Sequence, residues 1–146
     1  MELDELYREA ILDHARHPRN FGELEGSDRS ASATNVGCGD AIRLFLRLSP
    51  AGRIEAIRFS GSGCAISTAS ASLLTLAVQG QSSEEAQALS ARIQRLLTGT
   101  SAPQDDLPGD LAALAGVRRF PQRVGCAMLS WHALEEALRG PEKSPA

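Results

Sequence analysis

The sequence has no long apolar run, no excess of positive charge and few cysteines, and each shortage excludes a class of protein. No apolar run approaches the roughly 20 residues that a membrane-spanning helix needs, so we expect no membrane association. The net charge is −3, which argues against nucleic-acid binding because such domains usually carry a basic surface. The N-terminus (MELDE) has neither the basic start nor the apolar block of a secretion signal. We therefore expect a cytoplasmic protein.

The three cysteines, at positions 38, 64 and 126, cannot all be paired within one chain. Disulfides are rare in the cytoplasm, where metal binding or thiol chemistry is the more common use of cysteine. The sequence therefore directs attention to what these thiols bind or react with.

The length and patterning predict one α+β domain over residues 1–146. A chain of this length forms a single domain with a proper core, and it shows no internal repeat. We expect a small antiparallel sheet of about three strands, packed against an N-terminal helix and several C-terminal helices. The tail 140–146, which contains two prolines, is expected to be frayed.

The first half of the chain has helical and then alternating patterns. An apolar stripe predicts a helix from residue 3 to about 16, ending before Pro18. A polar loop then leads into a short strand that ends near residue 35. Clean alternation predicts a strand over 42–48, and another is expected from 53 to 60, broken by the Gly61-Ser62-Gly63 segment.

The second half is predicted to be helical. Small and apolar residues from Cys64 to Val78 predict a helix buried on more than one side. Residues 82–85 (SSEE) are typical of a capping box and precede an amphipathic helix that closes at Gly99. We then expect a surface loop over 99–110, a short helix over 111–115, and a closing helix with Cys126 near its start.

Each cysteine is expected at a junction between elements. Cys38 lies in a glycine turn with a carboxylate two positions on, in the segment Gly37-Cys38-Gly39-Asp40. Cys64 and Cys126 are each expected near a helix N-terminus, where partial positive charge and unpaired amides favour thiolate over thiol.

Three thiolates and one carboxylate make four ligands, the usual number for tetrahedral zinc, and thiolates also suit iron–sulfur clusters. The alternative is that the cysteines are small buried hydrophobes and that Asp40 belongs to an ordinary turn. The separations between the cysteines match no zinc-finger pattern, so the spacing alone leaves both interpretations open. We interpret His14 and His17 as packed or exposed side chains, and Arg118 and Arg119 as part of a solvated loop.

Several motifs together resemble the U-type iron–sulfur assembly proteins (IscU, SufU and the NifU N-terminal domain). The N-terminal segments LYRE, ILDH and PRNFG resemble the opening of that family. Its three ligand motifs are similar to GCGD around Cys38, GSGCAIS followed by ASAS around Cys64, and RVGCA around Cys126. The resemblance extends from Leu6 to about Leu138 and implies the SufE/NifU-like fold.

Within that family, the chain resembles the SufU branch. The IscU branch has a histidine immediately before the third cysteine and a Leu-Pro-Pro-Val-Lys segment, and this chain has Gly125 and no such segment. The long stretch between Cys64 and Cys126 is also SufU-like. One departure is that SufU proteins tend to have lysine at the position of Gly125, so a charge beside the site is missing here.

The resemblance implies a zinc-dependent, sulfurtransferase-like protein that takes sulfur from a SufS-like cysteine desulfurase. Zinc would be held by Cys38, Asp40, Cys64 and Cys126. Cys38 would be the sulfur acceptor, released when a histidine of the partner replaces it, and Arg123 would be an auxiliary residue or a plain surface arginine. Iron–sulfur scaffold or recipient proteins would be further partners.

Two alternatives use the same four residues. The first is a scaffold on which an iron–sulfur cluster is assembled and transferred, which the glycine in place of histidine disfavours. The second is a purely structural zinc module, which the flexible turn around Cys38 disfavours. A colourless protein with one zinc would favour sulfur transfer, and a brown, iron-loaded protein would favour the scaffold.

Overall fold

The computed structural model of the chain describes residues 9–35, 37, 39–98, 107 and 109–139. In chain order, its elements are α2 (Glu9–Arg16), β1 (Arg29–Asn35), β2 (Asp40–Leu48), β3 (Ile54–Ser62), α3 (Ala65–Val78), α4 (Ser83–Thr98), the 3-10 helix η1 (Gly109–Arg119) and α5 (Pro121–Arg139). The predicted α+β class is confirmed. Helix α2 ends before Pro18 as expected, and residues 3–8 of the predicted first helix lie outside the described part.

The three strands form one antiparallel sheet in the order β1-β2-β3. Strand β2 buries Ile42, Leu44 and Leu46 and exposes Arg43 on the opposite face, which is the predicted alternation of a half-buried strand.

The expected break at Gly61 is wrong, because β3 continues to Ser62. Gly61 pairs with Ile42 at a φ of +126°. A Cβ at Gly61 would overlap the carbonyl oxygen of Ala41. Glycine is needed there for a close backbone approach inside the sheet, and the sequence pattern alone does not separate that role from a strand end.

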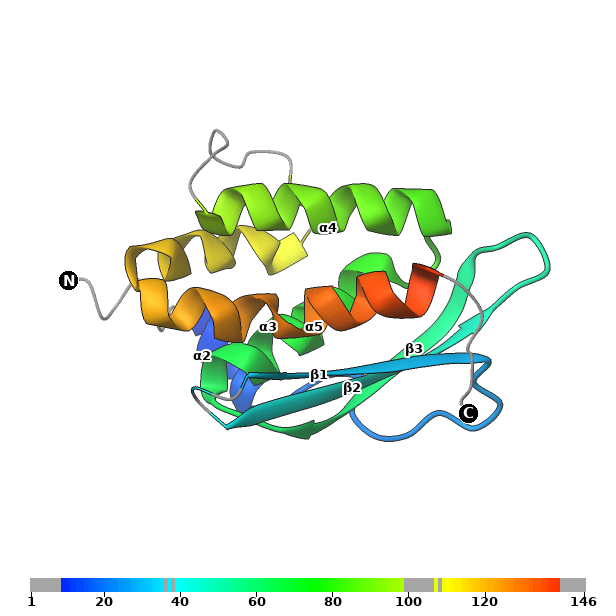
Figure 1. Cartoon of the computed structure of the whole chain (residues 1–146), viewed down its shortest axis with the longest axis horizontal. Helices are drawn as coiled ribbons and strands as arrows, with labels where there is room; N and C mark the ends of the chain where they lie inside the picture. Colours follow the sequence, from blue (N-terminus) through cyan, green and yellow to red (C-terminus); the bar gives the residue numbers. More distant parts are fainter. Residues whose placement is uncertain (1–8, 36, 38, 99–106, 108, 140–146) are drawn as a thin grey trace.

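The helices cover one face of the sheet in two layers (Figure 1). Helix α5 packs on β1 and β2, and α3 packs on β3 and against α5. Helix α4 and η1 lie beyond α5, on the side away from the sheet. The other face of the sheet carries polar side chains and the half-buried Phe45. Among the described residues, no helix is both long and apolar enough to cross a membrane.

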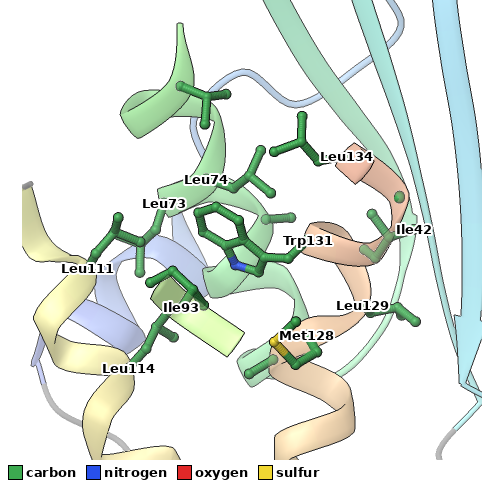
Figure 2. Close-up of a cluster of buried hydrophobic side chains, with 14 of the residues drawn as sticks. Ile42, Leu73, Leu74, Ile93, Leu111, Leu114, Met128, Leu129, Trp131 and Leu134 are labelled. Atoms are coloured by element: carbon green, nitrogen blue, oxygen red, sulfur yellow. The ribbon is translucent and has the colours of Figure 1, made fainter. Parts of the chain in front are cut away.

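Trp131 of α5 lies at the centre of the core, among the leucine and isoleucine side chains of α3, α4 and η1 (Figure 2). It is fully buried, and its indole Nε1 donates a 3.0 Å hydrogen bond to Ser70 Oγ on α3. The Ser70 hydroxyl in turn donates to the carbonyl oxygen of Ala127, at 2.7 Å. Small residues on α3 therefore allow close packing and also satisfy the one polar atom of the tryptophan.

The segment that contains His14 and Arg19 is hydrogen-bonded to a buried serine of α3. Ser72 Oγ lies 2.7 Å from His14 Nδ1 and accepts a 2.8 Å hydrogen bond from the Arg19 N–H. Burial lowers the pKa of His14 below its usual value. The His17 side chain is 77% exposed. Our interpretation of these histidines as packed and exposed side chains is confirmed.

The capping box before α4 is confirmed: Glu85 N–H donates to Ser82 Oγ, and Ser82 N–H donates to the Glu85 carboxylate. The expected loop over 99–110 lies largely outside the described residues. The helix η1 is longer than the predicted 111–115 segment. It ends with Arg118 and Arg119, which are exposed as expected but belong to a helix and not to a loop. Arg118 Nη1 also donates a 3.3 Å hydrogen bond to the Leu96 carbonyl oxygen of α4.

Candidate metal centre

Three of the four predicted donors meet where the sheet and the helices join. Asp40 begins β2, Cys64 immediately precedes α3, and Cys126 lies in α5. One ligand atom from each of the three lies within 4.8 Å of the other two. Cys38 lies outside the described residues, between the described Gly37 and Gly39. Residues far apart in the sequence are thus brought to one point by the packing of β2, α3 and α5.

Asp40 is the link between the sheet and the start of α3. The residue is buried, and its Oδ1 accepts a 3.0 Å hydrogen bond from the Cys64 N–H. Its Oδ2 lies 3.6 Å from Cys64 Sγ. Cys64 is the N-cap residue of α3, with extended backbone and no side-chain cap. The carboxylate therefore accepts from an amide at the N-terminal end of that helix, where negative charge is favoured by the helix dipole.

Gly63 lets this carboxylate approach the helix. A Cβ at position 63 would overlap Ser67 Oγ and would lie 3.1 Å from Asp40 Cγ. The sequence-based prediction assigned Gly63 only to the end of a strand and missed its place against the site. The signal that was available is its position immediately before a candidate ligand, where glycine permits a close approach.

Cys126 is fully buried in the second turn of α5. The prediction that it lies near the start of a helix is confirmed, but α5 begins at Pro121, so Cys126 lies more than one turn inside the helix. Proline fits the first position of a helix, where its missing N–H is not needed. The thiol of Cys126 is therefore presented from inside a regular helix and not from a helix N-terminus.

The turn between β1 and β2 is organised by Asn35. This residue is the last of β1 and pairs with Asp40 in the sheet register. Its Oδ1 accepts a 3.1 Å hydrogen bond from the Gly37 N–H, and its carbonyl oxygen accepts a 2.8 Å bond from the Gly39 N–H. Gly39 has a φ of +72°, a conformation that favours glycine. Sequence reasoning missed Asn35, although an asparagine two residues before a glycine is a known turn signal.

Arg123 lies in the first turn of α5, and its side chain is half-buried. It precedes Cys126 by three residues, a spacing that places two residues on the same side of a helix. Its backbone N–H donates a 2.7 Å hydrogen bond to the carbonyl oxygen of Phe120. An auxiliary role for Arg123 stays a prediction.

The donor set suits a thiophilic metal ion. Tetrahedral zinc with sulfur and oxygen ligands separates neighbouring ligand atoms by about 3.5–3.8 Å. Asp40 Oδ2 and Cys64 Sγ already lie 3.6 Å apart, and all three donors lie within 4.8 Å of one another. Asp40 is buried, and within the described part of the chain no lysine, arginine or histidine forms an ion pair with it. A buried carboxylate beside two thiols is a costly arrangement without a cation. The residues present therefore fit zinc, and also the iron of a cluster.

Fold and site together define a small α+β domain with a largely buried cluster of two cysteines and one carboxylate whose donors fit a metal ion. Sequence comparison identifies its relatives. The chain belongs to the NifU-like N terminal domain family, whose pattern it matches over residues 6–140.

Relatives with two different names are similar to this chain to the same degree. It is 42% identical to the zinc-dependent sulfurtransferase SufU of Bacillus subtilis (strain 168), with 93% of this chain and 91% of the relative covered. It is 41% identical to the iron-sulfur cluster assembly scaffold protein IscU of Streptococcus pyogenes serotype M1, with 94% and 86% covered.

A solved structure of a SufU protein from Fervidobacterium islandicum AW-1, described as a candidate scaffold of the SUF system, superposes with a TM-score of 0.86 at 27% identity. The superposition covers 92% of this chain and 98% of that one. The predicted fold and family are thereby confirmed, and the choice between sulfur transfer and scaffolding is not made by similarity.

Proposed function

We propose that this protein is a zinc-dependent sulfur acceptor that takes persulfide sulfur from a cysteine desulfurase for iron–sulfur cluster assembly. The observation that carries the proposal is the meeting of Asp40, Cys64 and Cys126 at one point. Cys38, the fourth predicted ligand, stands in the sequence between Gly37 and Gly39, whose N–H groups both donate to Asn35 at the end of β1. The zinc-dependent relative at 42% identity supports the choice of metal.

Asp40, Cys64 and Cys126 are assigned as the residues that hold the metal throughout, with Cys38 as the ligand that reacts. The metal, when bound, would keep the thiols deprotonated at neutral pH. The chain supports the division of roles in two ways. Asp40 and Cys126 are buried within β2 and α5, whereas Gly39, the residue that follows Cys38 in the sequence, is exposed and has a positive φ.

The transfer itself is a thiol–disulfide type of exchange. The Cys38 thiolate attacks the outer sulfur of the persulfide on the desulfurase cysteine. A sulfur–sulfur bond forms to Cys38 as the bond to the desulfurase sulfur breaks, and the desulfurase leaves as a thiolate. The persulfide changes its carrier and keeps its oxidation level, so the step needs no added oxidant or reductant. Iron–sulfur scaffold or recipient proteins would take the sulfur onward.

A scaffold function is the second candidate, because a relative at 41% identity is named as a scaffold. Thiolate and carboxylate donors can hold the iron of a cluster as well as zinc. Gly125 favours sulfur transfer: on the interpretation drawn from the sequence, the scaffold branch has a histidine there. The two functions predict different metals in the purified protein.

Metal analysis beside a desulfurase assay tests the proposal. We expect a colourless protein with one zinc per chain that stimulates a SufS-like desulfurase, and a Cys38→Ser variant that fails to stimulate it while remaining folded. The control is wild-type protein stripped of metal and reloaded with zinc, which should regain stimulation. A brown, iron-loaded protein, or equal stimulation by the variant, would contradict the proposal.

A further inference from the structure

We propose that Asn35 is the positioning residue for the acceptor turn, and that glycine at position 125 leaves the Asn35 side chain the space for this arrangement. The consequence for sulfur transfer rests on the proposed function of Cys38. The structural part of the inference concerns Asn35, Gly37, Gly39 and Gly125, and it can be tested without metal or desulfurase.

Asn35 binds both chain neighbours of Cys38. Its side-chain Oδ1 accepts from the Gly37 N–H at 3.1 Å, and its backbone oxygen accepts from the Gly39 N–H at 2.8 Å. One residue at the end of a regular strand thus restrains the turn on either side of Cys38. Asn35 is half-buried, whereas the Gly37 N–H that its side chain binds lies at the exposed surface.

The same amide group faces α5. A Cβ built on Gly125 would lie 2.9 Å from Asn35 Nδ2, closer than two such atoms can pack. A side chain at position 125 would therefore push the amide aside. Because Oδ1 and Nδ2 belong to one planar group, a rotation that moves Nδ2 away from Gly125 also moves Oδ1 away from the Gly37 N–H.

The Asn35 side chain thus lies against the residues that precede two of the predicted donors. Gly125 immediately precedes Cys126, a residue of the donor cluster, and Gly37 immediately precedes Cys38. Asn35 itself pairs with Asp40 across the sheet. The amide of Asn35 therefore holds Gly37 relative to both β2 and α5, and we expect its loss to weaken the contribution of Cys38, the next residue, to metal binding.

Amide hydrogen exchange of the reduced, metal-free protein, measured residue by residue with NMR, tests the structural part. We expect Asn35→Ala to speed exchange at Gly37 about tenfold, the factor that corresponds to about 1.4 kcal/mol. Asn35→Asp keeps an acceptor at Oδ1, and exchange at Gly37 should stay near the wild-type rate. Ile93, buried in α4, provides the reference amide, and its exchange should not change.

A substitution at Gly125 provides a second, independent test by hydrogen exchange. Gly125→Ala should speed exchange at Gly37 to a similar degree, because the added methyl group displaces the amide. The double variant Asn35→Ala with Gly125→Ala should be no faster than Asn35→Ala alone, since neighbouring changes that act through one contact are not additive. Unchanged exchange at Gly37 in Asn35→Ala, equal acceleration at Ile93, or full additivity in the double variant would each overturn the inference.

Zinc affinity, measured by competition with a chelator, tests the consequence. We expect Asn35→Ala to weaken zinc binding about tenfold, in the range typical of residues that orient metal ligands. At a saturating zinc concentration, the same variant should regain sulfur acceptance. Faster exchange at Gly37 with unchanged zinc affinity would refute the positioning role. If the proposed function is wrong instead, Cys38→Ser stimulates a desulfurase normally while the exchange results for Asn35 stand.

Discussion

Gly63→Ala is the substitution that the geometry of the site predicts most sharply. The added methyl group would overlap Ser67 Oγ and press on the Asp40 carboxylate, whose Cγ would lie 3.1 Å away. Ser67 is fully buried and its hydroxyl donates to the Cys64 carbonyl oxygen at 3.1 Å, so it cannot move aside without losing that bond. Overpacking of this kind destabilises a domain by about 1–3 kcal/mol.

The expected effect has two separable parts. The clash with Ser67 acts on stability, and the contact with Asp40 acts on metal affinity, which should fall about 10–100-fold. In the double variant Gly63→Ala with Ser67→Ala, the clash with the Ser67 hydroxyl is removed and the contact with Asp40 remains. The Cys64 carbonyl oxygen still accepts a 3.0 Å bond from the Thr68 N–H, so Ser67→Ala alone should be mild, at about 1 kcal/mol or less.

Urea unfolding of the metal-free proteins and chelator competition with zinc measure the two parts. The double variant should recover most of the lost stability and little of the lost zinc affinity. Recovery of both together would show that Gly63 acts only through packing, and unchanged zinc affinity in Gly63→Ala would refute the assignment of Asp40 as a ligand.

Two further predictions concern groups away from the site. Because burial holds the pKa of His14 below 6.5, the folded state binds fewer protons, and stability should fall as the pH drops below about 6.5, by at most about 1.4 kcal/mol per pH unit. Thermal melts should show this slope in wild type and a flatter one in His14→Gln. Ser130 has a buried hydroxyl with no hydrogen-bond partner among the described residues, so Ser130→Ala should be neutral or stabilise by up to about 1 kcal/mol in urea unfolding. Ser70→Ala, the matched control, breaks bonds to Trp131 and Ala127 and should destabilise by about 1–3 kcal/mol; an equal effect of the two variants would contradict this account.

Local sequence patterns predicted the helices and strands well, because each pattern arises from the geometry of a single element. The alternation of Ile42, Leu44 and Leu46 follows from one buried face of a strand. The pair of Ser82 and Glu85 follows from the unpaired amides at a helix start. Both patterns can be recognised without knowing what the element packs against.

Other features depended on contacts between distant segments. From the sequence alone, Gly61 is typical of a strand end and Gly63 of a turn. Their roles follow only from the fold, which places Gly61 against the carbonyl of Ala41 and Gly63 against Asp40. The donors could be named from residue type and family motifs, but their meeting point is set by how β2, α3 and α5 pack. The contact between Asn35 and Gly125 joins two elements that no short pattern connects.

The most direct test of the central claim is to map the sulfur after a single turnover. The zinc-loaded protein would be mixed with a SufS-like desulfurase and isotopically labelled cysteine, alkylated at once, and analysed peptide by peptide by mass spectrometry. The account predicts one labelled sulfur atom on Cys38, and none on Cys64 or Cys126. Label on none of the three thiols of this protein, or label on Cys64 or Cys126 that persists in the Cys38→Ser variant, would contradict it.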